Sequence, residues 1–500
     1  MFDRMIFKGH LTMLYPNGAI ARLLYGQGVL LKDFKPYVEG ISQQIKQHAE
    51  QLAVDARRPF RYLETSMTAK KGQSKETLAQ QMAVEDNLKE GLIGVFYTLE
   101  PCSTFTVRGN HQTQKLEVVR RNTKCLHYYF YYLDAELGFM HIRLQSWFPF
   151  QIQVYVNGRE CLGRYLDQQG ITYQRYDNCF TQINDLVAAQ EFCEKFAHFE
   201  WPPVLNALAE RVNPILKVIR EAGFTGYYWV ADQCEIATDI MFKDRTSLEA
   251  ILPDLFEHAI LKSACQDILR FLGRKLHGNF KGEITSSLKK RPEGWRARHT
   301  LKRNSLKLYD KGSVLRVETT INNPSEFKIC QETEDGKLRW VPMRKGVSNL
   351  YRYAEVGLQA NQRYLEHLAQ AKLKSKAIPH LDDLCRSHTQ NGKRYARFCP
   401  LQDADRDLFA AVLSGEFALN GFRNHDLCAK LYAQPAASTK ETKQRCSRMS
   451  RLIAKLRGHG LIAKVKDARL YRITKLGSRV LFAVLSFYQT DFPTAFQSAL

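Results

Sequence analysis

The stretch NSLKLYDKGSVLRVETTINN, residues 304–323, decides the fold, because it reads as two strands joined by a tight turn. Side chains alternate between the two faces of a strand, so each strand has an apolar face and a polar face. The polar positions are Ser305, Lys307, Tyr309, Arg316, Glu318 and Thr320. The turn should bring Tyr309 and Lys311 beside Arg316 and Glu318. This pattern predicts an antiparallel sheet with one unusually charged face.

Working outward from this hairpin, strand-like and helix-like stretches alternate along a chain of 500 residues. A chain of this length exceeds what one hydrophobic core usually organises. We predict an α+β fold that is multidomain, with a mixed or antiparallel sheet core and crossover helices. The expected segments are 1–92 (mostly helical), 93–185 (first α+β unit), 186–343 (second α+β unit, with the candidate site), 344–403 (long helix and linker) and 404–500 (a compact last domain).

The charge balance points to a polyanionic partner. The chain has 73 Lys and Arg against 51 Asp and Glu, a net charge of +22. A field of this sign attracts nucleic acid or an anionic membrane surface. No apolar run has the length of a membrane span, and the first residues do not resemble a signal peptide. We therefore expect a cytoplasmic protein that binds nucleic acid and no membrane.

Cysteine and histidine usage suggests no special site. The 12 cysteines are scattered and include no C-x-x-C, so we interpret them as reduced thiols, mostly in the core. His127 and His141 lie on neighbouring predicted strands and could meet as ligands. Single histidines on strands usually have structural roles, which is the interpretation we prefer.

The segment that precedes the hairpin is strongly basic. Between Arg270 and Arg303, eleven Lys or Arg face only Glu283 and Glu293. A flexible basic segment suits binding to a phosphate backbone, and Phe280 and Trp295 could stack on bases of a single strand. The residues expected to bind nucleic acid here are Lys289, Lys290, Arg291, Arg296 and Arg298. The alternative is a solvated surface loop.

Carboxylates near the hairpin suggest a metal site. Glu235 and Asp239 are four residues apart on a predicted strand, so they share a face. If that strand pairs near Glu318, the three carboxylates could hold Mg²⁺ or Mn²⁺, which prefer oxygen ligands. Lys311 or Arg316 would then offset the charge that develops at a phosphodiester. The structural alternative is that Glu318 simply pairs with Lys307 or Arg316 across the strands.

The pattern S-x-K-x-Y-D-K, here Ser305 to Lys311, followed by L-R-x-E after an acidic strand, resembles rolling-circle replication initiators of the single-tyrosine plasmid type. The similarity covers about 90 residues, 230 to 322. It implies an enzyme that nicks one DNA strand through a phosphotyrosine bond with a divalent metal. It would make Tyr309 the nucleophile, with Glu318, Asp239 and Glu235 as metal ligands.

The last domain has a second resemblance. Three expected helices (405–413, 424–432 and 439–460) precede a hairpin over 461–474 and a closing helix. The run SRLIAKLRGHGLIAKVKDARLYRITKLG, residues 450–477, is similar to winged-helix domains of multiple-antibiotic-resistance-type regulators. That resemblance implies that the third helix enters the major groove while the wing reaches phosphate or the minor groove. The basic residues concerned are Lys443, Arg445, Arg448, Arg451, Lys455, Arg469 and Arg472.

Together these features favour a metal-dependent enzyme that nicks or transfers a DNA strand and is positioned by a winged helix. Tyr309, Lys311 and Arg316 would form its catalytic group. A hydrolytic nuclease that uses metal-bound water would keep the carboxylates without the tyrosine. A regulator that binds DNA or structured RNA without catalysis would need neither the metal-binding carboxylates nor the tyrosine nucleophile. All three interpretations stay open at this point.

Overall fold

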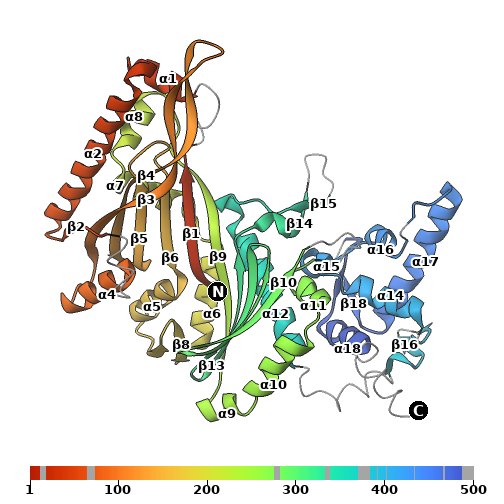
Figure 1. Ribbon diagram of the computed structural model, residues 1–500. Helices are drawn as coiled ribbons and strands as arrows, with labels where there is room; N and C mark the ends of the chain where they lie inside the picture. Colours follow the sequence, from red (N-terminus) through yellow and green to blue (C-terminus); the bar gives the residue numbers. More distant parts are fainter. Residues whose placement is uncertain are drawn as a thin grey trace. The chain divides into compact units, whose positions relative to one another are not determined.

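The computed structural model describes residues 1–11, 19–64, 74–274, 282–332, 338–369, 383–390, 392–400, 402–432, 434–465 and 468–486. The chain divides into two compact units. Unit 1 comprises residues 1–236, 320–322 and 345–354, and unit 2 comprises residues 237–319, 323–344 and 355–500. The predicted combination of helices with a large mixed sheet is confirmed (Figure 1).

Unit 1 is built on a sheet with the hydrogen-bonded order β9-β1-β6-β5-β4-β3-β2. Its pairs are antiparallel except for β2 and β3, which run parallel. The strands are β1 (Phe2–His10), β2 (Phe60–Tyr62), β3 (Gly91–Asn110), β4 (Lys115–Asp134), β5 (Gly138–Gln145), β6 (Ile152–Asn157) and β9 (Tyr228–Met241), with a separate hairpin of β7 (Tyr173–Tyr176) and β8 (Cys179–Ile183). Strand β9 continues into unit 2 from Ala237.

Helices cover this sheet unequally. The helices of unit 1 are α1 (Ala19–Gly26), α2 (Phe34–Asp55), α4 (Lys75–Glu85), α5 (Gly158–Gln168), α6 (Leu186–Ala197), α7 (Trp201–Val212) and α8 (Ile215–Glu221). Helix α7 packs on an apolar face, where the rings of Phe7 and Trp201 are 4.6 Å apart. Helix α4 covers part of the opposite face through a small cluster that includes Ala79, Phe96 and Tyr131. Much of that opposite face carries polar side chains.

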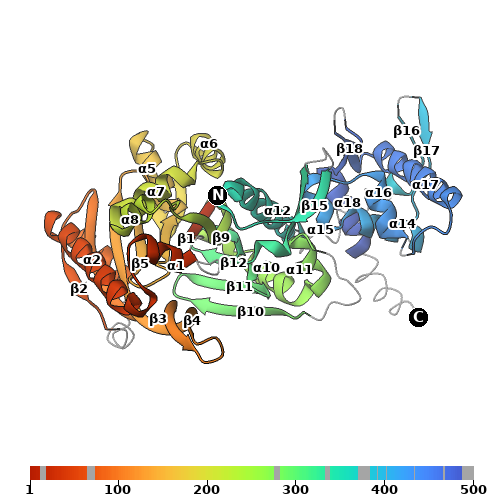
Figure 2. The ribbon, with the colours of Figure 1, turned by 90° about the horizontal axis from the view of Figure 1, so that it is seen from above.

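Unit 2 has its own antiparallel hairpins, in the strand order β10-β11-β12-β13-β9. Figure 2 shows β10, β11 and β12 side by side. Its strands are β10 (Ile284–Arg291), β11 (Gly294–Leu301), β12 (Asn304–Lys311), β13 (Val314–Ile321), β14 (Lys328–Glu332), β15 (Leu338–Pro342), β16 (His388–Gln390), β17 (Lys393–Tyr395), β18 (Ile462–Lys464) and β19 (Tyr471–Ile473). Its helices are α9 (Arg245–Glu249), α10 (Leu252–Glu257), a π-helix (His258–Lys262), α11 (Cys265–Phe271), α12 (Leu350–Leu368, begun in unit 1), α14 (Asp403–Val412), α15 (Gly415–Asn420), α16 (Asn424–Leu431), α17 (Thr439–Gly458) and α18 (Lys475–Ser486).

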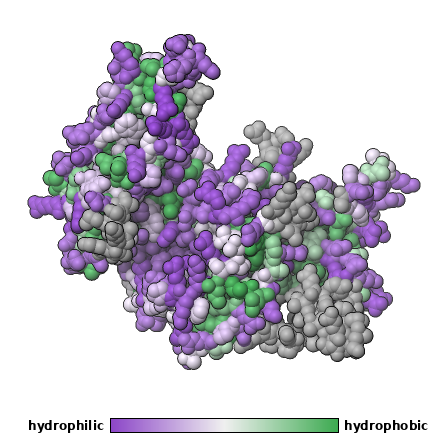
Figure 3. All heavy atoms as spheres, viewed as in Figure 1, coloured by the Kyte–Doolittle hydropathy of each residue, from purple (hydrophilic) through white to green (hydrophobic). Residues whose placement is uncertain are grey.

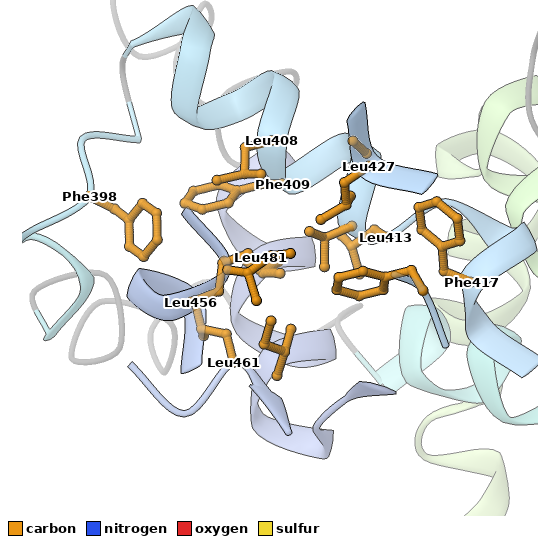
Figure 4. Close-up of a cluster of buried hydrophobic side chains, with 14 of the residues drawn as sticks. Phe398, Leu408, Phe409, Leu413, Phe417, Leu427, Leu456, Leu461 and Leu481 are labelled. Carbon is orange, nitrogen blue, oxygen red and sulfur yellow. The ribbon is translucent and has the colours of Figure 1, made fainter. Parts of the chain in front are cut away.

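The C-terminal elements of unit 2 share one hydrophobic core. Leu408 and Phe409 of α14, Leu427 of α16 and Leu456 of α17 converge there with Leu481 of α18 (Figure 4). In α17 the buried residues Met449, Ile453 and Leu456 recur at helical spacing, which leaves the opposite side of the helix to its basic residues. Hydrophobic periodicity therefore explains why these helices form and how they are oriented.

Three expectations differ from the structure. Residues 2–10, in a region predicted as mostly helical, form a strand between β6 and β9. The basic segment that was expected to be flexible contains the β10–β11 hairpin in its described part. The linker expected at 372–403 contains a short hairpin, β16–β17. Each difference involves strand pairing, which depends on partners that are distant in sequence.

Across the described ranges, no helix is long and apolar enough to cross a bilayer. The face of the molecule seen in Figure 3 is mostly hydrophilic, with a smaller hydrophobic area over α9 and α10.

Candidate nucleic-acid interface

The hairpin quoted at the outset is present as β12 and β13, and its turn is held in place by three contacts. Gly312 has a φ of 63°, which glycine adopts without strain. The guanidinium of Arg245 donates to the Gly312 carbonyl at 2.8 Å and also pairs with Asp310. The amide of Phe242 donates to the Ser313 carbonyl at 2.9 Å. The hairpin tip is therefore fixed to the chain that follows β9.

Strand register gathers basic side chains on one face of the unit 2 sheet. Arg296 of β11 lies opposite Tyr309 of β12 and opposite Lys289 of β10, and directly paired residues share a face. Arg298 lies opposite Lys307. We call this side the basic face, and its members are Lys289, Arg291, Arg296, Arg298, Lys307, Tyr309, Lys311, Arg316, Asp239 and Glu318. It has seven cations and two carboxylates.

The opposite face of the same strands is apolar and covered by α12. Leu306, Leu308 and Val317 have no exposed surface. Two polar groups on this side bond to the helix, since His299 contacts the Tyr364 hydroxyl at 2.9 Å and Thr319 contacts Asn361 at 2.7 Å. One face of the sheet therefore packs into the hydrophobic core and the other carries charged side chains, as the alternation of polar and apolar residues predicted.

Two buried ion pairs occupy the middle of the basic face. Arg316 donates to both oxygens of Asp239, from Nε at 2.8 Å and from Nη2 at 3.0 Å. Lys307 Nζ donates to Glu318 at 2.5 Å, which is the pairing expected from the structural interpretation of this hairpin. These four residues are largely buried, and each carboxylate has a cation against it. The remaining five cations of the face exceed what its carboxylates neutralise.

Two of these cations have unsatisfied donors. The Nε atoms of Arg296 and Arg298 are buried and have no hydrogen-bond partner among the described residues. A buried donor without an acceptor costs about 1–3 kcal/mol, and more when it is charged. Guanidinium donors of this kind require acceptor oxygens, which a phosphate ligand supplies. Tyr309 is half-buried and lies opposite Arg296, and the Lys311 ammonium lies 5.6 Å from the centroid of the tyrosine ring.

The carboxylates predicted to bind metal are divided between the units. Glu235 belongs to unit 1, where Gln233 donates to it at 3.0 Å and Arg4 lies 3.8 Å away. Asp239 and Glu318 belong to unit 2 and carry the ion pairs described above. A divalent ion at either residue would compete with a bound guanidinium or ammonium. The pairs at Asp239 and Glu318 are those of the structural alternative, and a Mg²⁺ or Mn²⁺ site at these carboxylates stays a prediction.

Some residues of the basic segment lie outside the basic face. Lys290 pairs with Trp295 across β10 and β11, one position out of phase with Lys289, so both point to the other side of the sheet. The Lys290 ammonium lies 5.6 Å from the Trp295 ring centroid. Phe280, which was expected to stack on bases, lies outside the described residues. Lys307, in contrast, belongs to the basic face, as the alternation along its strand predicted, although it was not among the residues expected to bind nucleic acid.

The cations of the C-terminal region fall into two groups. Exposed side chains on α17 and the following hairpin are Lys443, Arg448, Arg451, Arg469 and Arg472. Arg445 instead donates to Glu441 and to the Gln434 carbonyl. Lys455 lies 3.7 Å from Asp405 and 3.8 Å from the Phe398 ring centroid, and burial lowers its pKa. Arg445 and Lys455 thus have local structural roles that the sequence analysis did not anticipate.

Comparisons with known proteins found no relative. No protein-family model matches the chain, and neither the curated proteins nor the solved structures contain a significant match.

Proposed function

We propose that this protein binds nucleic acid and that the basic face of unit 2 receives the phosphate backbone. The observation that carries this proposal is the pair of buried Nε donors on Arg296 and Arg298, which have no acceptor among the described residues. Guanidinium groups suit phosphate because they donate in a planar fork and keep their charge. The net charge of +22 adds a long-range attraction for the same ligand.

The C-terminal elements of unit 2 support a second contact with DNA. Helices α14, α15, α16 and α17 are followed by the β18–β19 hairpin and the closing helix α18, so the chain order is that of the expected winged helix with one further short helix, α15. In that arrangement α17 is the recognition helix, and its exposed Lys443, Arg448 and Arg451 face the duplex. Contacts to phosphate would position the protein without carrying sequence information.

The test is fluorescence anisotropy with labelled single-stranded and double-stranded DNA and with RNA of the same sequence. We expect the Arg296→Ala/Arg298→Ala variant to bind its preferred strand at least about tenfold more weakly, or roughly 1.4 kcal/mol. Lys290→Ala is the matched control, because Lys290 lies on the neighbouring position of the same hairpin but on the other face. Equal losses in both variants, or no loss in either, would contradict the assignment of this face.

The position of Tyr309 favours a second candidate function, strand cleavage. Tyr309 lies directly across the strand pair from Arg296, and the ammonium of Lys311 lies 5.6 Å from the centroid of its ring. In this reaction the phenol oxygen attacks phosphorus, a phosphotyrosyl bond forms, and the 3′ oxygen leaves as a hydroxyl after taking a proton. Neighbouring cations would stabilise the charge that develops on the phosphate.

This candidate is tested by incubating the chain with supercoiled and single-stranded DNA plus Mg²⁺ or Mn²⁺, followed by denaturing gels. Strand cleavage predicts a protein–DNA adduct that is absent with Tyr309→Phe, while DNA binding by that variant persists. Free ends without an adduct would indicate a hydrolytic nuclease. Binding without cleavage under every metal condition would leave the binding function alone, and loss of binding as well would contradict both.

A further inference from the structure

A cluster of two cysteines and one histidine lies on the polar face of the unit 1 sheet. In the β3–β4 hairpin, Cys102 lies opposite Thr123, Cys125 opposite Glu100, and His127 opposite Thr98. Cys125 and His127 are two residues apart on β4 and therefore share a face. Cys102 lies diagonally across from Cys125 on that face. One rigid pair of strands thus presents all three side chains to the same point.

The three side chains are close enough to share one ion. The sulfur atoms of Cys102 and Cys125 are 3.0 Å apart. Together with a ring nitrogen of His127, they form a group whose ligand atoms all lie within 4.8 Å of one another. Cys125 and His127 are buried, whereas Cys102 is partly exposed. The cluster is therefore preorganised and also open to solvent on one side.

A disulfide is the main competing explanation for two sulfurs at this distance. Diagonal neighbours across an antiparallel pair have Cα atoms about 7–8 Å apart. The Cα atoms of disulfides usually lie about 4.4–6.8 Å apart, so a bond here would require backbone movement. A disulfide would also give His127 no role. A shared metal ion places tetrahedral thiolate ligands farther apart, at Zn–S distances of about 2.3 Å, and uses the imidazole as well.

Among the described residues, the group of possible ligands at this point has three members, Cys102, Cys125 and His127. Glu100, the nearest carboxylate across the strands, accepts hydrogen bonds from Lys75, Tyr129 and Arg143, each at 2.8 Å, and so is already engaged. Two thiolates neutralise a divalent ion, which suits a partly buried site beside the Arg143 guanidinium. Thiolate and imidazole ligands select zinc over Mg²⁺ or Mn²⁺. Three protein ligands and an open fourth position are typical of zinc sites that bind water or a substrate.

We propose that Cys102, Cys125 and His127 form a zinc site with one exchangeable position. This site is independent of the basic face, and its test does not depend on nucleic-acid binding. Zinc content of the purified chain should approach one equivalent. After chelation under reducing conditions, titration with Co²⁺ should give thiolate-to-cobalt charge-transfer absorption that saturates at one equivalent. Added Zn²⁺ should abolish that absorption.

Variants decide which residues are responsible. Cys102→Ser should weaken the charge-transfer band, because one of the two thiolate ligands is removed. This variant is informative because Cys102 is partly exposed and its replacement should fold. His127→Gln should weaken Co²⁺ binding by more than the roughly 10- to 100-fold that loss of an outer-shell partner costs, because a direct ligand is removed. Cys161→Ser is the control, since Cys161 is a buried cysteine of unit 1 outside the cluster.

Two results would overturn the proposal. One is a reduced, folded wild-type chain that binds Co²⁺ without thiolate absorption, or binds no Co²⁺. The other is a chain that contains no zinc and loses two thiols together on mild oxidation in the wild type but not in Cys102→Ser. The second result would identify a redox-active cysteine pair.

Discussion

At the scale of single residues, the buried pair of Arg316 and Asp239 shows how the charged face is stabilised. Both side chains are nearly inaccessible, with exposed fractions of 1% and 7%. Removing one partner of such a pair leaves a buried charge without compensation, whereas replacing both with apolar residues avoids that penalty. The pair therefore makes each partner necessary for stability without implying that the pair itself is stabilising.

Arg316→Met should lower the free energy of unfolding by about 3–5 kcal/mol, because the buried Asp239 carboxylate loses the guanidinium that donates to both its oxygens. The double variant Arg316→Met/Asp239→Leu should recover much of this loss. Denaturant unfolding monitored by circular dichroism measures both. Lys35→Met is the control, since Lys35 and Glu39 form an exposed pair with side-chain exposures of 78% and 56%. A loss below about 1 kcal/mol for Arg316→Met would contradict the account of this pair.

At the scale of elements, β11 and α12 are joined by a buried histidine. His299 has no exposed surface and bonds to Ser286 at 2.8 Å and to Tyr364 at 2.9 Å. Burial lowers its pKa from the usual value of 6.5 to about 4. In the pH range between these values the unfolded chain binds the extra proton and the folded chain does not, so stability falls as pH falls.

His299→Gln should therefore flatten the pH dependence of stability between pH 6.5 and about 4. The variant should lose up to about 3 kcal/mol of the pH-dependent change in the free energy of unfolding, since one pKa unit corresponds to about 1.36 kcal/mol. Unfolding midpoints measured across this range for the wild type and for His299→Gln provide the comparison. His388→Gln, at an exposed histidine, should follow the wild-type curve. A curve for His299→Gln that is parallel to the wild type would contradict this explanation.

The local alternation of polar and apolar residues predicted several strands and helices. The features that it did not predict depend on pairing between strands that are distant in sequence. Alternation in the stretch from Asn304 to Asn323 correctly separated its core face from its charged face. No local signal could place β1 between β6 and β9, because that position depends on strands more than 140 residues away. The proximity of Cys102 and Cys125 depends on the register of the β3–β4 hairpin, so composition alone gave no reason to connect them.

The site itself could be predicted only in part. The sequence correctly identified a basic segment and a charged hairpin, but it did not show that β10 and β11 would extend the hairpin into one basic face. It assigned Lys290 and Lys289 to the same role, although alternation along β10 separates them. It also could not decide whether Asp239 and Glu318 would meet a metal or a cation, because the partner of a buried carboxylate depends on tertiary structure.

At the scale of the whole molecule, the net positive charge and the basic face both favour a ligand with many phosphates. Binding of this kind releases counterions, so its affinity falls as salt rises. The slope of that dependence reports the number of phosphate contacts rather than the total charge of the protein. This separates contacts at Arg296 and Arg298 from a diffuse attraction by a chain of net charge +22.

The most direct measurement is therefore the slope of log affinity against log salt for the preferred nucleic acid, in the wild type and in Arg296→Ala/Arg298→Ala. If these arginines contact phosphate, the slope for the double variant should be shallower by about two units, one for each phosphate contact that is lost. Lys290→Ala should keep the wild-type slope. An unchanged slope in the double variant, with the fold intact, would show that nucleic acid binds elsewhere and would contradict the assignment of the basic face.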